Sequence, residues 1–174
     1  MNAHLIPIAL SFLLAASLLS AQSSTPAPAT NACPPTSTPA ELVSALDDAI
    51  SGPADKDRTC LRALFTPGAR LNPLVPTSDG ITPRTLLVED WIAAMQRRGS
   101  TPLFEHQIKF TANAYGPMAH LWSTYEIRSS PASQPLARGI NSIQAIYDGS
   151  HWRIYQVLWI AESPDLPIPA DDLP

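Results

Sequence analysis

Residues 137–160 have the sequence Ala137-Arg-Gly-Ile-Asn-Ser-Ile-Gln-Ala-Ile-Tyr-Asp-Gly-Ser-His-Trp-Arg-Ile-Tyr-Gln-Val-Leu-Trp-Ile160. Two runs rich in β-branched and aromatic residues flank Asp148-Gly149, and an Asp-Gly step between such runs is typical of a β-hairpin. Apart from the N-terminal segment, no other part of the chain is so apolar over two successive strands. The sequence therefore predicts that this hairpin forms the centre of the hydrophobic core.

Two further strands are predicted immediately before the hairpin. Over residues 104–115 apolar and polar residues alternate, which is typical of a half-buried strand. Gly116-Pro117 indicates a turn into a second strand over residues 119–128. The alternation predicts that His106 lies on the apolar side of its strand and that Glu105 lies on the solvated side.

Three helices are predicted upstream of these strands. Thr38-Pro39-Ala40-Glu41 has the pattern of a capping box with proline at the first helical position, and Gly52-Pro53 ends that helix. A second helix is expected over residues 55–65. A third is expected to begin at Thr82-Pro83 and to end at Arg97-Arg98-Gly99, where the arginines complement the helix dipole and the glycine suits the C-cap.

The order of these elements predicts the fold class. A short strand over residues 70–75, limited to a sheet edge by Pro73, lies between the second and third helices. The order is then helix, helix, strand, helix and four long antiparallel strands. We therefore predict an α+β domain over residues 38–162, with its helices packed on one face of a curved sheet. The tail over residues 163–174 is rich in proline and is expected to be extended.

The first 37 residues differ in composition from the rest of the chain. Residues 1–30 contain no Lys, Arg, Asp or Glu, and Leu5–Leu19 is an apolar run, shorter than the roughly 20 residues that cross a bilayer. The small residues after this run are typical of a signal peptide that ends at residue 21, and an uncleaved anchor is the alternative. Residues 22–37 have the composition of a flexible linker. We expect an exported protein, periplasmic or extracellular, with no membrane segment after cleavage.

Export affects whether the two cysteines are expected to form a disulfide. Cys33 and Cys60 are the only cysteines of the chain, and an oxidising compartment allows a disulfide between them. Two free thiols are the alternative. We expect the disulfide.

Composition and motifs exclude several classes of function. The net charge of −4 is spread along the chain, whereas a nucleic-acid-binding surface needs clustered Lys and Arg. The sequence has no glycine-rich phosphate loop, no nucleophile elbow and no metal-binding helix motif. Neither a cofactor nor a metal is therefore predicted.

Four stretches carry a resemblance to a known family. Phe65–Arg70 and Gly149–Ile154 resemble fold-defining segments of the nuclear transport factor 2-like superfamily, and the likeness covers residues 38–162. Tyr115–Tyr125 and Arg138–Gln144 most resemble the uncharacterised exported bacterial group within it. The superfamily includes SnoaL-like polyketide cyclases, ketosteroid isomerases, scytalone dehydratase and many exported bacterial proteins with no assigned function. The resemblance implies a cone, in which a strongly bent sheet wraps around three helices and encloses a pocket. It also implies a homodimer that forms through the outer face of the sheet.

Two residues are candidates for acid–base chemistry. His106 is predicted on the apolar side of its strand, where a pocket-facing imidazole acts as an acid or base near neutral pH. A core histidine bonded to neighbouring groups is the alternative. Asp90 is next to Trp91, close to the apolar stripe of the third helix, and the ketosteroid isomerases that the chain resembles use a carboxylate base in the cone. A solvated helix residue is the alternative for Asp90.

Polar residues on the penultimate strand are candidates for binding. Arg138, Asn141 and Gln144 lie on a predicted central strand, where burial requires hydrogen-bond partners. Successive residues point to opposite faces, so Arg138 and Gln144 share one face and Asn141 takes the other. A pocket and a dimer interface both supply such partners.

Aromatic residues complete the predicted site, and two functions remain open. Trp91, Trp122 and Tyr125 are candidates for the lining of an apolar cavity, with plain core or interface packing as the alternative. The first function is an exported protein that binds a small apolar molecule. The second is a cofactor-free isomerase, dehydratase or hydrolase that acts by acid–base chemistry on such a molecule.

Overall fold

A computed structural model describes residues 33–174, which form one compact unit. The predicted signal peptide and most of the predicted linker lie outside the described residues. The helices are α1 (Pro39–Ile50), α2 (Thr59–Ala63) and α3 (Val88–Gln96), followed near the C-terminus by the 3-10 helix η1 (Ala170–Asp172). The strands are β1 (Phe65–Thr77), β2 (Gly80–Pro83), β3 (Phe104–Tyr115), β4 (Met118–Arg128), β5 (Ala137–Tyr147) and β6 (Trp152–Ala161).

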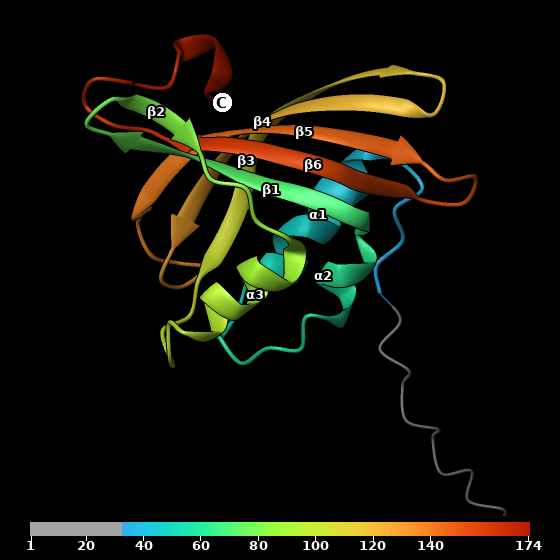
Figure 1. The fold of residues 1–174 in the computed structure, drawn as a ribbon, viewed down its shortest axis with the longest axis horizontal. Helices are drawn as coiled ribbons and strands as arrows, with labels where there is room; N and C mark the ends of the chain where they lie inside the picture. The colour runs from blue at the N-terminus through green and yellow to red at the C-terminus, as the bar shows by residue number, and fades with distance from the viewer. Residues whose placement is uncertain (1–32) are drawn as a thin grey trace, which may run out of the picture. The chain divides into compact units, whose positions relative to one another are not determined.

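The six strands form one curved sheet in the order β2-β1-β6-β5-β4-β3. All neighbouring pairs are antiparallel except β1 and β6, which are parallel. The three helices lie on one side of this sheet, and the C-terminal segment lies on the other (Figure 1). The predicted α+β architecture is therefore confirmed. Among residues 33–174 no helix has the length and apolarity needed to span a membrane.

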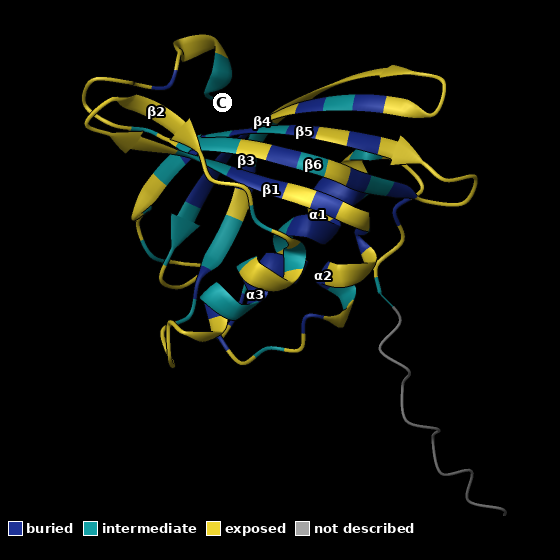
Figure 2. Ribbon diagram, in the orientation of Figure 1, coloured by how far each residue is buried: buried dark blue, intermediate teal, exposed yellow. Residues whose placement is uncertain are grey.

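The hairpin of β5 and β6 lies in the middle of the sheet, as predicted. Its turn contains Gly149 at φ +100°, a conformation that favours glycine. Buried positions recur along both strands (Figure 2). Ile143, Ala145, Ile154 and Val157 are buried members of the hydrophobic core. The hairpin thus forms the floor against which the helices pack.

Helix α1 begins at the predicted capping box. The Thr38 hydroxyl accepts a hydrogen bond from the Glu41 N–H at 3.1 Å, and the Glu41 carboxylate accepts one from the Thr38 N–H at 3.1 Å. At the other end, the buried Arg58 side chain donates to the carbonyls of Ile50 and Pro53, at 2.8 and 3.1 Å. Arg58 therefore satisfies carbonyls that the end of a helix leaves unpaired.

Several element boundaries differ from the prediction. Strand β1 is longer than the predicted strand over residues 70–75, and it lies inside the sheet between β2 and β6, so the predicted edge position was wrong. Helix α2 ends at Ala63 because Phe65 already pairs with Ile154 of β6, so tertiary pairing overrides local helix propensity. Residues 82–83 do not start the third helix: they belong to β2, which forms a hairpin with β1. Helix α3 starts later, at Val88, where the Asp90 carboxylate accepts a hydrogen bond from the Leu87 N–H at 2.9 Å.

The C-terminal tail folds back over the outer face of the sheet. The Thr124 hydroxyl donates to the carbonyl of Asp172 at 2.6 Å, and the Trp122 indole N–H donates to its carboxylate at 3.1 Å. Ile168 is only 9 % exposed. The tail is therefore packed against the domain and is not simply extended.

Candidate functional site

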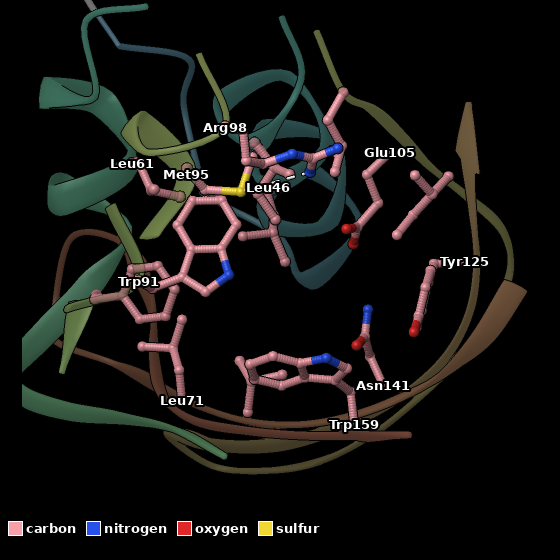
Figure 3. Close-up of a pocket in the computed structure, with 15 residues that line it drawn as sticks. Leu46, Leu61, Leu71, Trp91, Met95, Arg98, Glu105, Tyr125, Asn141 and Trp159 are labelled. Atoms are coloured by element: carbon pink, nitrogen blue, oxygen red, sulfur yellow. Dashed lines mark hydrogen bonds between the residues drawn. The ribbon is translucent and has the colours of Figure 1, made fainter. Parts of the chain in front are cut away.

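A cavity of about 230 Å³ lies between the helices and the concave face of the sheet (Figure 3). Eleven of its 15 lining residues are apolar. The four polar ones are Arg98, Glu105, Tyr125 and Asn141. A mostly apolar cavity with a few convergent polar groups is the usual form of a small-molecule site.

Glu105 is the acidic group of this cavity. Its side chain comes from β3 and points into the space that Tyr125 and Asn141 also line (Figure 3). Burial and the nearby negative charge of Asp47 raise the pKa of Glu105 to about 7. The backbone of Glu105 is fixed by Ser51 of the α1 C-cap, whose hydroxyl donates to the Glu105 carbonyl at 3.0 Å and accepts from its N–H at 2.9 Å. The carboxyl group thus sits on a rigid backbone and titrates near neutral pH.

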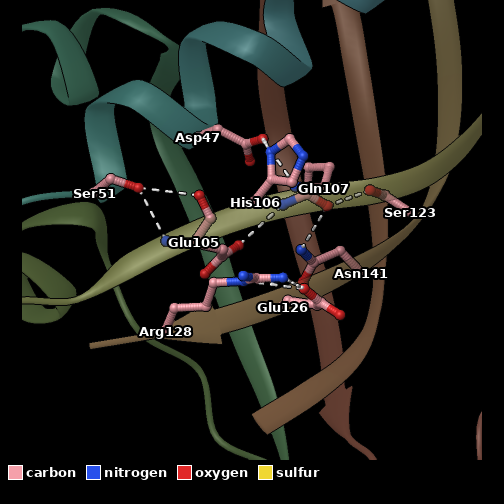
Figure 4. A network of polar contacts seen from close by, with 9 residues as sticks. All are labelled: Asp47, Ser51, Glu105, His106, Gln107, Ser123, Glu126, Arg128 and Asn141. Atoms are coloured by element: carbon pink, nitrogen blue, oxygen red, sulfur yellow. Dashed lines mark hydrogen bonds and ion pairs between the residues drawn. The ribbon is translucent and has the colours of Figure 1, made fainter. Parts of the chain in front are cut away.

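A row of polar side chains on adjacent strands orients Glu105 (Figure 4). The Gln107 side-chain nitrogen donates to the Glu105 carboxylate at 3.1 Å. The Gln107 side-chain oxygen accepts from the Ser123 hydroxyl and, at 3.5 Å, from the Asn141 side-chain nitrogen. These two bonds fix which way the Gln107 amide faces, so its nitrogen is directed at Glu105.

Asp47 connects the row to helix α1. Its carboxylate accepts from the Gln107 backbone N–H at 2.9 Å, at the free edge of β3. The same oxygen lies 3.4 Å from Nδ1 of His106 (Figure 4). Burial raises the pKa of Asp47 above its ordinary value, although the hydrogen bonds from Gln107 and the proximity of His106 oppose this shift. Asp47 therefore contacts the exposed His106, and its negative charge acts on Glu105.

Tyr125 supplies the second polar side chain on the sheet side of the cavity. Burial, together with the negative charge of Glu105, raises the pKa of the Tyr125 phenol, so the phenol keeps its proton. The phenol is therefore available as a hydrogen-bond donor at neutral pH. Trp91 of α3 and Trp159 of β6 provide flat apolar walls (Figure 3).

Three of the residues predicted for the binding pocket meet in this cavity. Trp91, Tyr125 and Asn141 come from α3, β4 and β5 and all line it. The prediction that Asn141 faces away from Arg138 and Gln144 fits this placement, because neither of the latter lines the cavity. The concave face of β5 is thus the one that carries Asn141.

The other three predicted pocket residues point away from the cavity. The Trp122 indole N–H bonds to Asp172 of the tail. Arg138 forms an ion pair with Glu162 at 2.9 Å, and Gln144 accepts a hydrogen bond from Gln156 at 3.1 Å. These side chains lie on the face of the sheet opposite to the helices.

Neither predicted acid–base residue lines the cavity. The His106 side chain is 69 % exposed and reaches only Asp47, and Asp90 caps the start of α3. The predicted sidedness of β3 was wrong: Gln107 is buried, Glu105 faces the cavity, and His106 is exposed. Most apolar residues of the alternating pattern, such as Phe110, follow a register shift between Gln107 and Lys109. Their orientation therefore does not predict which face of the sheet Glu105 points to.

Sequence reasoning therefore missed Glu105, Gln107 and Arg98. The available signal was the pair of long polar residues two apart at Glu105 and Gln107, which points both to one face of a strand. Among residues 33–174 no three His, Cys, Asp or Glu side chains are grouped to hold a metal ion.

Cys33 and Cys60 form a disulfide in the structure, with their Cα atoms 5.2 Å apart. Cys60 lies in α2, and Cys33 precedes α1. The bond ties the segment before α1 to the helical layer. In the same segment the Thr36 carbonyl accepts a hydrogen bond from the Trp152 N–H at 2.7 Å, which joins it to the start of β6.

Comparison with known proteins identifies the fold. No protein-family model and no curated protein matches the chain. Among solved structures, a protein from Kribbella flavida is similar with a TM-score of 0.53 and 15 % identity, over 71 % of this chain and 88 % of that one. A protein of unknown function with a cystatin-like fold, from Nostoc punctiforme, is similar with a TM-score of 0.56 and 13 % identity, over 74 % of this chain and 90 % of that one.

A protein from Shewanella baltica, described as nuclear transport factor 2-like and of unknown function, gives a TM-score of 0.51 and 12 % identity over 71 % and 90 %. The chain has a nuclear transport factor 2-like fold. At these identities the likeness shows the fold alone. The nuclear transport factor 2-like cone accounts for the position of the cavity, and the chemistry of the cavity depends on this chain's own residues.

Proposed function

We propose that this protein binds a small, largely apolar molecule in the cone cavity. The observation that carries the proposal is the Glu105 carboxyl group, directed into a cavity whose other walls are mostly apolar. Burying a carboxyl group costs free energy that ordinary core packing does not require. A cavity of about 150 Å³ holds benzene, so the 230 Å³ here suit a single substituted ring.

The polar groups specify one end of the ligand. Below its pKa of about 7, Glu105 carries a proton and donates a hydrogen bond, as the Tyr125 hydroxyl does. Asn141 lies beside them and presents an amide to the same end of the cavity. A hydroxyl or carbonyl group on the ligand satisfies these donors, while Trp91 and Trp159 contact its apolar body.

Acid–base catalysis is the second candidate function. It is favoured by the pKa of Glu105, because a general base or acid works best when its pKa lies near the operating pH. In this version Glu105 takes a proton from a carbon or oxygen of the ligand, and the Tyr125 hydroxyl donates to the oxygen on which negative charge develops. Glu105 and Tyr125 thus replace His106 and Asp90 as the acid–base candidates.

We also propose that the protein is exported and forms a homodimer through the outer face of its sheet. The apolar N-terminal run and the Cys33–Cys60 disulfide support export. The exposed side chains of Met118, Tyr155 and Leu158 support the dimer. Light scattering tests the dimer: twice the monomer mass is expected, and a monomer mass at every concentration would exclude it.

Calorimetric titration tests the binding function. Phenol and cyclohexanone are compared with toluene, on the wild type and on Glu105→Gln and His106→Ala. These two residues are sequence neighbours that point to different environments, so His106→Ala is the matched control. Wild type and His106→Ala are expected to bind phenol equally, and Glu105→Gln about 3- to 10-fold more weakly. Absence of binding by every probe would refute the proposal, as would an equal loss in both variants.

A further inference from the structure

We propose that the ligand of this cavity carries a carboxylate and that Arg98, at the mouth, binds it and thereby selects acids over neutral molecules. This inference rests on the proposed binding function and adds the chemical class of the ligand. Arg98 follows helix α3, and its side chain lines the cavity beside Met95 (Figure 3). A planar guanidinium matches a carboxylate with two parallel hydrogen bonds.

The guanidinium of Arg98 has N–H groups that can donate hydrogen bonds to a ligand. In the described part of the chain, Arg62, Arg128, Arg138 and Arg153 each form an ion pair with a carboxylate, and Arg98 forms none. Its side chain makes a weak contact, from Nη1 to the Met95 sulfur at 3.9 Å. An incoming carboxylate therefore does not have to break an existing ion pair.

The charge inside the cavity favours an anion. Among the lining residues, Arg98 is the only basic side chain and Glu105 the only carboxyl side chain. Arg98 is always charged, whereas Glu105 is neutral below about pH 7. Under these conditions the cavity carries one positive charge, in a protein whose net charge is −4. This local charge is opposite in sign to that of the whole chain.

The depth of each polar group orients the ligand. Arg98 is exposed to solvent, while Tyr125 and Asn141 are almost fully buried. A carboxylate at the mouth keeps part of its hydration, so its desolvation cost is small. A hydroxyl or carbonyl group at the opposite end then reaches the buried donors. The preferred ligand is an aromatic or alicyclic acid with a second polar group across the ring.

A matched pair of probes and a matched pair of variants test this inference. 4-Hydroxybenzoate and its neutral analogue 4-hydroxybenzamide are titrated calorimetrically at about pH 6, where Glu105 is mostly protonated. The variants are Arg98→Gln and Arg97→Gln. Arg97 is the adjacent arginine and does not line the cavity, so its loss changes net charge equally.

Wild type and Arg97→Gln are expected to bind the acid about 10-fold or more tightly than the amide. Arg98→Gln is expected to bind both probes with the affinity that the wild type has for the amide. At about pH 8, where Glu105 is ionised, the preference of the wild type for the acid is expected to shrink.

The possible failures are distinguishable. If the amide binds but the acid binds no more tightly, or if Arg97→Gln loses the preference as fully as Arg98→Gln does, the inference is overturned and the binding function stands. If neither probe binds, and phenol, cyclohexanone and toluene do not bind either, the proposed function itself is refuted.

Discussion

The phenol ring of Tyr125 lies against the Cα atom of Gly139, its partner on strand β5. A Cβ atom at position 139 would lie 2.4 Å from the Tyr125 hydroxyl oxygen and 2.4 Å from the carbonyl oxygen of Ile160. The absence of a side chain at Gly139 therefore allows Tyr125 to line the cavity in this position. Gly139 is a structural requirement of the site, although it does not line the cavity.

Gly139→Ala is accordingly expected to lower the free energy of unfolding by about 1–3 kcal/mol, because the added methyl overpacks a well-filled region. The same variant is expected to bind phenol more weakly, since Tyr125 must move. Gly116→Ala is the control: its Cβ would meet nothing within 4 Å, and its φ of +56° costs only local strain. Chemical denaturation and calorimetry measure both effects. Equal phenol affinity for Gly139→Ala and wild type would contradict the role given to Tyr125.

Desolvation of the Glu105 carboxyl group predicts a dependence of stability on pH. Its pKa is about 7 in the folded protein and ordinarily 4.5, so the folded state holds the proton more tightly than the unfolded state does. The stabilisation is complete below about pH 4.5 and is lost as the pH rises through 7. The total change is up to about 3 kcal/mol.

Glu105→Gln removes this titration. The variant is expected to match the wild type near pH 4.5 and to be more stable by up to about 3 kcal/mol at about pH 8. Asp47, whose pKa is also raised, remains in both proteins, so the difference between the two curves reports the titration of Glu105 together with its interaction with Asp47. Urea denaturation across this pH range provides the measurement. Parallel curves for the two proteins would show that Glu105 is not desolvated.

The disulfide gives a third prediction. Alkylation of the purified protein without reductant is expected to modify neither Cys33 nor Cys60, as read by intact mass. Replacement of both by serine is expected to cost about 3.5 kcal/mol, the loop-entropy value for a bond that spans 27 residues. Two modified thiols would contradict the bond.

The packing of the C-terminal tail gives a fourth prediction. Deletion of residues 163–174 removes the buried Ile168 and the hydrogen bonds of Asp172 to Trp122 and Thr124. It is expected to lower the free energy of unfolding by about 2–4 kcal/mol, and to leave phenol binding unchanged because no tail residue lines the cavity. Asp171→Ala is a suitable control within the tail. A deletion as stable as the full chain would mean that the tail contributes nothing.

The sequence predicts the framework of this protein better than its site. The capping box at Thr38 and the hairpin at Asp148-Gly149 are local signals that tertiary structure does not override. Which side chains of β3 face the helices cannot be predicted from local sequence, because it depends on the register shift after Gln107 and on the packing of α1 against β3. The hydrogen-bond partners of the Glu105 carboxyl group are Gln107 on β3 and Asn141 on β5. Because these partners meet only in the folded sheet, the sequence alone predicts a solvated carboxylate at position 105.

The four tryptophans test the central claim most directly. Trp91 and Trp159 line the cavity, and Trp122 and Trp152 do not, so the last two are internal controls. Their indole N–H resonances are followed in proton–nitrogen correlation spectra during titration with phenol, after assignment by Trp→Phe variants. We predict that the resonances of Trp91 and Trp159 shift together and saturate, while those of Trp122 and Trp152 stay in place. Four unmoved resonances at saturating phenol, or shifts confined to Trp122 and Trp152, would contradict a ligand site in the cone.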